Sequence, residues 1–300
     1  MMKVAWNSIY AHPLPDNHRF PMEKYKLLPQ QLIHEGTLQK DDFFSPRKLT
    51  EQEVLSIHSK SYWVRLAALD LSRQEERRSG FPLSEELVRR ELTINGGTVQ
   101  AAHYALDHGI AMNIAGGTHH AYADHAEGFC LLNDIAVAAR YLIDKGLSNQ
   151  ILVIDLDVHQ GNGTANIFQS ESAVFTFSMH GEKNYPMHKE KSNLDIPLKD
   201  GTKDREYINL VKNEIPKIIN KVKPDFIFFQ SGVDVLESDK LGRLSLTIEG
   251  CRWRDEIVFE NCSKFEIPIV AVMGGGYSED INTIIEAHAN TFRIASQILT

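Results

Sequence analysis

Short apolar segments that alternate with helix-length amphipathic segments constrain the fold more than any other feature of this sequence. The apolar runs are rich in β-branched and aromatic residues, as expected for strands that are buried on both faces. The predicted strands are 3–6, 110–117, 151–157, 173–180, 225–232 and 267–276. The predicted helices are 50–72, 84–108, 133–145, 203–222, 247–264 and 279–298. This alternation predicts an α/β fold whose parallel sheet is covered by helices on both faces.

The pattern runs without a repeat, a low-complexity linker or a break in composition, so we expect one domain over residues 1–300. Thr50 and Glu53 have the spacing of a capping box at the start of the helix 50–72. Pro216 is expected to kink or divide the helix 203–222. The first fifty residues are expected to form a long ordered loop region, because they contain Pro13, Pro15, Pro21, Pro29 and Pro46.

Composition excludes several classes of function. The net charge of −8 and the pI of about 5.9 come without a basic stripe, so we expect no nucleic-acid partner. No stretch approaches the length of a membrane span and the first twenty residues lack a signal-peptide pattern, so we expect neither a membrane segment nor secretion. Cys130, Cys251 and Cys262 are scattered singly, which favours a reducing compartment such as the cytoplasm.

Polar residues stand where the predicted strands end. In "ILVIDLDVHQGNG" (151–163), the apolar strand runs directly into Asp155, Asp157 and His159. Positions two apart in an extended chain point to the same side, so these three side chains should converge. Two unpaired carboxylates are costly to desolvate, which calls for a positive charge between them. Other strand ends carry Thr118, His119, His120, Ser178, His180, Asp234 and Tyr277.

The ends of parallel strands form the usual ligand site of an open α/β sheet. Asp157, His159 and Asp234 would supply two oxygens and one nitrogen there, which suits zinc or a similar divalent ion with one open position. A single Asp after a strand is more often a turn or helix-capping residue, but the DxDxH spacing with a second strand-end Asp favours the metal. His119 and His120 are candidate proton-transfer groups, the alternative being a pair of hydrogen-bonded structural histidines.

Four blocks of the sequence resemble the signature motifs of the histone deacetylase family. They are "GGTHHAYADHAEGFCLLNDIAVAA" (116–139), "IDLDVHQGNG" (154–163), "SGVDVLESDKLGRLSLT" (231–247) and "GGGYSEDI" (274–281). The segment "HPLPDNHRFPMEKY" (12–25) is most similar to the class IV branch and its bacterial relatives. The resemblance implies a single deacetylase domain with the arginase/deacetylase α/β fold, whose central parallel sheet has about eight strands.

The resemblance also assigns roles to the strand-end residues. It implies Asp157, His159 and Asp234 as the metal ligands, with zinc expected and ferrous iron as the alternative. His119 and His120 would be the tandem histidines of catalysis, and Asp155 would orient His119. Tyr277 would donate to the substrate carbonyl, and Asn162 would buttress His120 where the class I branch has an acid. Because an amide supports an imidazolium less than a carboxylate does, we expect a lowered pKa for His120.

Further positions follow from the same resemblance. A structural potassium ion is implied at Asp155, Asp157, His159, Ser178 and Met179, and a second one near Phe168, Glu171 and Val174. The acyl-lysine tunnel is implied to contain Phe129, Cys130, Tyr185, Leu241 and Gly275. Arg19 is expected to line an internal cavity beneath the metal.

The implied activity is zinc-dependent hydrolysis of the amide bond of acyl-lysine, either in a protein or in an acylated small amine. Four alternatives stay open at this point. The enzyme could prefer long fatty-acyl chains, or it could act on acetylpolyamines. An arginase-type ureohydrolase would need two metal ions and a second acid where this chain has Leu236. A catalytically silent scaffold would not need the complete set of histidines and Tyr277. The sequence leaves the oligomeric state open.

Overall fold

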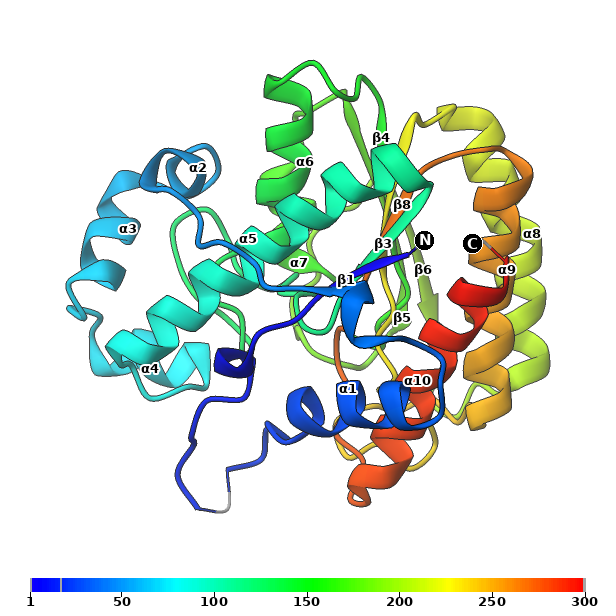
Figure 1. The fold of residues 1–300 in the computed structure, drawn as a ribbon, viewed down its shortest axis with the longest axis horizontal. Coiled ribbons are helices and arrows are strands. Elements are labelled where there is room, and N and C mark those ends of the chain that lie inside the picture. Colours follow the sequence, from blue (N-terminus) through cyan, green and yellow to red (C-terminus); the bar gives the residue numbers. More distant parts are fainter. Residues whose placement is uncertain (1, 17, 299–300) are drawn as a thin grey trace.

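A computed structural model describes residues 2–16 and 18–298. Its core is one sheet of eight parallel strands in the order β2-β1-β3-β8-β7-β4-β5-β6 (Figure 1). The strands are β1 Lys3–Ala5, β2 Phe43–Phe44, β3 Ile110–Asn113, β4 Ile151–Asp155, β5 Val174–Gly181, β6 Leu194–Leu198, β7 Phe226–Gln230 and β8 Ile269–Val272. The predicted α/β class with a parallel sheet of about eight strands is therefore confirmed.

Ten α-helices are present in the described part of the chain. They are α1 Lys24–His34, α2 Glu51–Leu55, α3 Lys60–Ala67, α4 Arg73–Ser79, α5 Glu85–His108, α6 Asp134–Asp144, α7 Asn162–Ile167, α8 Asp204–Val222, α9 Ile248–Lys264 and α10 Ile281–Ile298. Helices α5 and α6 pack on one face of the sheet, and α8, α9 and α10 pack together on the other, with α1 against α10 (Figure 1). Both faces are covered, which explains why the central strands are apolar throughout.

Three local predictions differ from the structure. The segment 50–72 forms two short helices, α2 and α3, although Thr50 and Glu53 do form the expected capping box. Helix α8 continues through Pro216, so this proline does not divide it, and the alternative of a kink stays a prediction. The first fifty residues are not only loop, because they contain β1, α1 and β2; the prolines fall mostly between these elements, and Pro29 lies within α1.

The register of the central strands brings their carboxyl ends to one level. Asp155 at the end of β4 lies opposite Ser178 of β5 and opposite Gln230, the last residue of β7. Gln230 in turn pairs with Val272 at the end of β8, and Val272 pairs with Asn113 at the end of β3. The loops that follow these strands therefore start from one edge of the sheet, which positions the candidate site.

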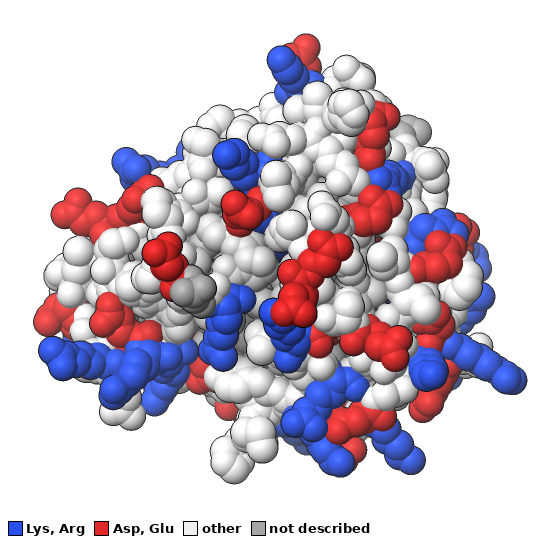
Figure 2. Space-filling view, turned by 90° about the horizontal axis from the view of Figure 1, so that it is seen from below, with Lys and Arg blue, Asp and Glu red and all other residues white. Residues whose placement is uncertain are grey.

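Acidic and basic side chains are interspersed over the face of the molecule seen from below, with some basic side chains gathered at its left edge (Figure 2). Among the described residues, no helix has the length and apolar character that a membrane crossing requires.

Candidate metal centre and active site

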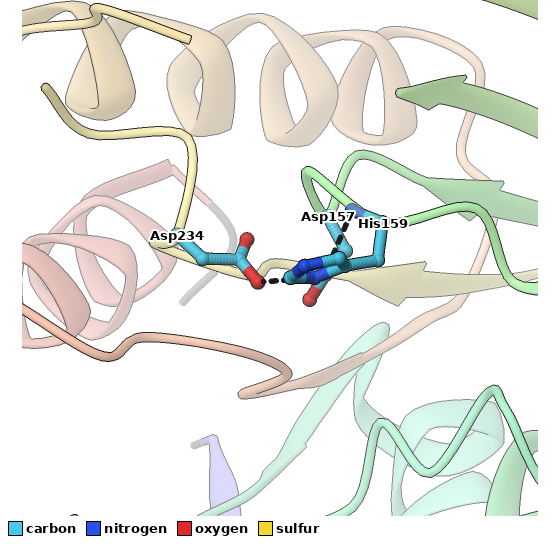
Figure 3. A group of neighbouring side chains, drawn as sticks. All are labelled: Asp157, His159 and Asp234. Carbon is cyan, nitrogen blue, oxygen red and sulfur yellow. Dashed lines mark hydrogen bonds and ion pairs between the residues drawn. The ribbon is translucent and has the colours of Figure 1, made fainter. Parts of the chain in front are cut away.

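Asp157 and His159, which follow β4, meet Asp234, which follows β7, at the carboxyl edge of the sheet (Figure 3). Each offers one potential ligand atom, and these three atoms lie within 4.8 Å of one another. The Nδ1 atom of His159 is 3.1 Å from Asp157 Oδ1 and 3.0 Å from Asp234 Oδ2. All three side chains are buried. The predicted convergence of these residues is therefore present in the fold.

Backbone amides hold the two carboxylates of this group in place. Val158 N donates to Asp234 Oδ1 at 2.9 Å, and Gly275 N donates to Asp157 Oδ2 at 2.8 Å. A Cβ atom on Gly275 would collide with the carboxylate of Asp234, so only glycine allows the loop after β8 to approach this closely. The second oxygen of each carboxylate stays directed toward His159.

The electrostatics of the group call for a cation. Burial and the neighbouring Asp157 raise the pKa of Asp234 to about 7. Burial lowers the pKa of His159, but its bonds to Asp157 and Asp234 outweigh burial and raise it to about 10. Two buried carboxylates with one imidazole nitrogen are the donor set that a borderline divalent ion such as zinc prefers. The residues present therefore fit a divalent metal.

His119 is paired directly with a carboxylate. Its Nδ1 atom lies 2.8 Å from Asp155 Oδ2, and its Nε2 atom faces Asp157 Oδ1 at 3.9 Å. Burial lowers the pKa of His119, but the charges of Asp155 and Asp157 outweigh burial and raise it to about 8. The bond to Asp155 therefore restrains the ring of His119 and favours its charged form.

His120 is paired with an amide instead. Its Nδ1 atom is 2.6 Å from Asn162 Oδ1, at the start of α7, and its ring centroid is 4.2 Å from that of His119. Burial, followed by the charges of His119 and His159, lowers the pKa of His120 well below its usual value. The direction agrees with the sequence prediction, although burial is the largest cause and the bond to Asn162 has the opposite effect.

Tyr277 follows the glycine run of the loop after β8. Gly274 and Gly276 have φ values of +68° and +156°, a backbone conformation that glycine adopts without strain. The backbone N–H of Tyr277 donates to Asp239 Oδ2 at 2.6 Å, and its ring centroid lies 6.5 Å from that of His159. The ring therefore stands beside the predicted metal position, and the role of Tyr277 as an oxyanion donor stays a prediction.

A cavity opens onto this group of residues. Phe129, Cys130 and Gly275, three of the predicted tunnel residues, line it together with both tandem histidines, Asp157, His159 and Tyr277. Tyr185 and Leu241 are not among its described lining residues. Tyr185 is 40% exposed and its ring centroid is 5.1 Å from that of His120, so it lies on the outer side. The cavity is partly open and its volume is about 30 Å³, which is room for one or two water molecules.

The residues expected around potassium lie beside the same strand ends. Ser178 is buried opposite Asp155, its hydroxyl bonds to His180 Nδ1 at 2.9 Å, and Met179 is fully buried. At the second expected position Phe168 and Val174 are buried, and the carboxylate of Glu171 is paired with Arg140.

The prediction for Arg19 is wrong. This residue is exposed, and its guanidinium lies over the ring of Phe129 at 4.9 Å instead of beneath the metal position. Its neighbour Phe20 lines the cavity, whereas Arg19 itself lies at the surface.

Two buried basic residues that the sequence did not single out lie beside the inner wall of the cavity. Lys24, at the start of α1, is fully buried and donates to Gly274 O at 3.2 Å. Its ammonium lies 5.5 Å from the ring centroid of Tyr277, and burial lowers its pKa to about 8. Arg90 of α5 also lines the cavity and is paired with Glu91. No local pattern marks Lys24, because polar and charged residues at the start of a helix are usually solvated.

The parallel sheet, with a buried Asp–His–Asp group and two histidines at its strand ends, defines a hydrolase of the amide deacetylase type. Residues 18–292 match the model of the histone deacetylase domain. The chain therefore belongs to the histone deacetylase family, as its motifs predicted.

Individual relatives agree with this assignment. An uncharacterized protein of Picosynechococcus sp. is 39% identical over 98% of both chains. The acetoin utilization protein AcuC of Staphylococcus aureus is 30% identical over 82% of this chain and 68% of its own. Histone deacetylase 2 of Arabidopsis thaliana is 27% identical over 89% of this chain and 72% of its own. The crystal structure of an HDAC homolog complexed with SAHA superposes with a TM-score of 0.85 at 25% identity, over 99% of this chain and 84% of the other.

Proposed function

We propose that this protein is a zinc-dependent deacetylase that hydrolyses the acetyl-lysine amide of a protein. The observation that carries the proposal is the buried group of Asp157, His159 and Asp234 with two differently supported histidines beside it. Asp157, His159 and Asp234 would hold the zinc ion, which supplies a Lewis acid for the amide carbonyl when bound. Ferrous iron is the alternative ion, because the same donor set suits it.

The side chains of this chain divide the proton transfers between them. His120 has a lowered pKa and is neutral at pH 7, so it takes the proton from the attacking water. Tyr277 donates a hydrogen bond to the oxyanion that develops on the carbonyl oxygen. His119, held by Asp155 and with its pKa raised to about 8, carries the proton that the leaving lysine amine takes up. The products are a free lysine side chain and acetate.

The small cavity supports a short acyl chain. The cavity beside the histidines has a volume of only about 30 Å³, so each further methylene of a long acyl chain would need space that the packed side chains do not leave. We therefore propose acetyl in preference to long fatty-acyl groups. Acetylpolyamines are the second substrate class, because their acetamide is the same reacting group.

The finer assignments of the resemblance belong to the same proposal. We assign the chain to the class IV branch as one domain over residues 1–300. A structural potassium ion would be held at Asp155, Asp157, His159, Ser178 and Met179, beside the sheet edge. The three cysteines are free and buried, which supports a reducing compartment such as the cytoplasm.

The test of the metal site is Asp234→Ala. This variant should lose its one tightly bound zinc ion and all hydrolysis, because removing one of three protein ligands leaves an incomplete site. Asp144→Ala, which removes an exposed acid on α6, should keep both. Full zinc occupancy in Asp234→Ala would show that Asp234 is not a ligand.

The test of the substrate is a panel assayed with zinc-loaded enzyme. One peptide carrying acetyl-, octanoyl- or myristoyl-lysine should give a kcat/KM that falls with chain length. The kcat/KM for the acetyl-lysine peptide should be higher than that for acetylputrescine. A rise of about tenfold or more toward myristoyl would replace the acetyl proposal by the long-chain one, since each buried methylene stabilises binding by about 0.8 kcal/mol.

A further inference from the structure

Among the described residues, Asn162 is the only side chain with a hydrogen bond to the ring of His120, and the two ends of its amide are chemically different. An amide has an oxygen that accepts and a nitrogen that donates, so it can face an imidazole in either orientation. A carboxylate at this position would accept in both. The orientation of Asn162 therefore has to be set by the groups on its other side.

Those groups are Glu127 and Tyr122. Asn162 Nδ2 lies 2.8 Å from Glu127 Oε1 and 3.1 Å from the hydroxyl of Tyr122. An ionised carboxylate can only accept, so the amide must present its N–H to Glu127. The Tyr122 hydroxyl donates to Glu190 Oε1 at 3.0 Å, which leaves its oxygen to accept from Asn162 as well. Both neighbours require the same orientation of the amide.

Glu127 is held in the ionised form. Burial raises the pKa of Glu127, but hydrogen bonds from His125, Tyr185 and Asn162 outweigh burial and lower it to about 2. Its backbone is fixed as well, since Glu127 and Cys130 exchange two backbone hydrogen bonds of 2.9 Å. Glu127 is therefore an ionised hydrogen-bond acceptor whose position is fixed by its backbone.

With its nitrogen facing Glu127, Asn162 turns its oxygen to His120 Nδ1 at 2.6 Å. Because this oxygen accepts, Nδ1 of a neutral His120 must carry the hydrogen, and the lone pair of the ring lies on Nε2. We propose that Glu127 is a positioning residue that sets the tautomer of His120 through Asn162, so that Nε2 is free to take the proton of the attacking water. The catalytic part of this inference rests on the proposed function; the tautomer part does not.

This arrangement replaces a direct His–carboxylate pair by a chain of three side chains. Asp155 bonds directly to the ring of His119, whereas the carboxylate of Glu127 is separated from the ring of His120 by Asn162. The ring is oriented by one hydrogen bond in each case, but His120 receives less stabilisation of its charged form.

The experiment compares Glu127→Gln with Asp124→Asn in the zinc-loaded enzyme. Asp124 is an exposed acid of the same loop that bonds to His125 and not to Asn162, so its variant is a matched control for the loss of one charge. In ¹⁵N-edited NMR of the imidazoles, His120 should be a single Nδ1–H tautomer in the wild type and in Asp124→Asn. In Glu127→Gln the second tautomer should become populated, because a glutamine at 127 accepts either orientation of Asn162 and only the 3.1 Å bond to the Tyr122 hydroxyl still favours the original one.

Kinetics provide the second measurement. Loss of a group that orients a reacting side chain typically costs about 10–100-fold in activity, and we expect this loss in kcat of Glu127→Gln, with KM within about twofold. Adding Asn162→Asp to Glu127→Gln should restore most of kcat, since a carboxylate next to the ring imposes the same tautomer directly. Asp124→Asn should stay within about twofold of the wild type.

The outcomes separate this inference from the proposed function. An unchanged His120 tautomer in Glu127→Gln, or no rescue by Asn162→Asp, would overturn the role of Glu127. Full activity of His120→Gln would overturn the assignment of His120 as the base, whatever the tautomer is. A mixed tautomer in Glu127→Gln with an inactive His120→Gln supports both.

Discussion

The two adjacent histidines of the site are supported by two different regions of the molecule. His119 belongs to the inner region, where the end of β4 supplies Asp155 and the buried carboxylates lie close by. His120 belongs to the outer region, where Asn162 of α7 and Glu127 of the loop between β3 and α6 form a chain of hydrogen bonds. The pKa of His119 is raised to about 8, and that of His120 is lowered well below its usual value.

The difference shows how one residue type is given two different pKa values within one site, as the two tasks proposed for these histidines require. A buried carboxylate in direct contact outweighs the burial of the ring and favours imidazolium, the proton donor. A neutral amide orients the ring but leaves burial as the largest effect on its pKa, which favours imidazole, the proton acceptor. The following predictions test whether the two regions act in this divided way.

The largest effect should come from removing His120, the proton acceptor proposed for the outer region. General acid–base catalysis contributes about 10²–10⁴-fold, and we expect kcat of His120→Ala to fall by about 10³-fold or more while zinc is retained. The measurement is kcat with acetyl-lysine peptide together with the zinc content. His103→Ala, which removes an exposed histidine of α5, should keep full activity. A kcat of His120→Ala within about tenfold of wild type would contradict the division.

A smaller loss should follow from Asp155→Asn in the inner region. Without the carboxylate, burial dominates, the pKa of His119 falls, and the ring is neutral at pH 7. Loss of such a partner typically costs about 10–100-fold, so kcat should decrease by that amount at pH 7. Assays over a range of KCl concentrations control for any loss of potassium. If kcat stays unchanged, the charge on His119 has no role in the reaction.

The double variant Glu127→Gln/Asn162→Asp makes the outer region resemble the inner one. A carboxylate next to His120 should raise its pKa by about one unit or more. The base must be neutral, so activity is lost as pH falls through its pKa, and a raised pKa moves the acidic limb of kcat/KM to higher pH. We expect about tenfold less activity than wild type at a pH on this limb and near parity at pH 8. A limb that stays in place or moves to lower pH would show that His120 is not the titrating base.

The smallest effect is expected for Lys24→Met, on the inner side. Methionine fills a similar apolar volume, but it loses the bond to Gly274 O and the charge beside the ring of Tyr277. At 5.5 Å, close to the limit of about 6 Å for such contacts, a cation–ring interaction contributes about 0.5–1 kcal/mol, so kcat should fall by about twofold to fivefold. The melting temperature should not fall, since burying an ammonium group is itself costly. Lys26→Met, at an exposed position of the same helix, should change neither quantity.

Patterns within single segments predicted a large part of the fold and of the site. The apolar runs predicted all central strands, and alternation along an extended chain predicted that Asp155, Asp157 and His159 converge. The edge strands were missed. Phe43–Phe44 is too short for a recognisable pattern, and Leu194–Leu198 is only half-buried and contains an Asp and a Pro.

The sequence by itself determined what depends on local geometry: the strand ends, the residue types at them and the motifs of the family. The tertiary structure alone decided which distant groups support them. Glu127 and Asn162 are 35 residues apart, and Lys24 and Gly274 are 250 residues apart. Contacts of this kind form only when the sheet brings its loops to one edge, and neither residue of such a pair shows a periodicity that would predict the other. Local periodicity is set by the backbone, whereas the direction of an amide or the burial of a lysine is set by whatever the rest of the chain packs around it.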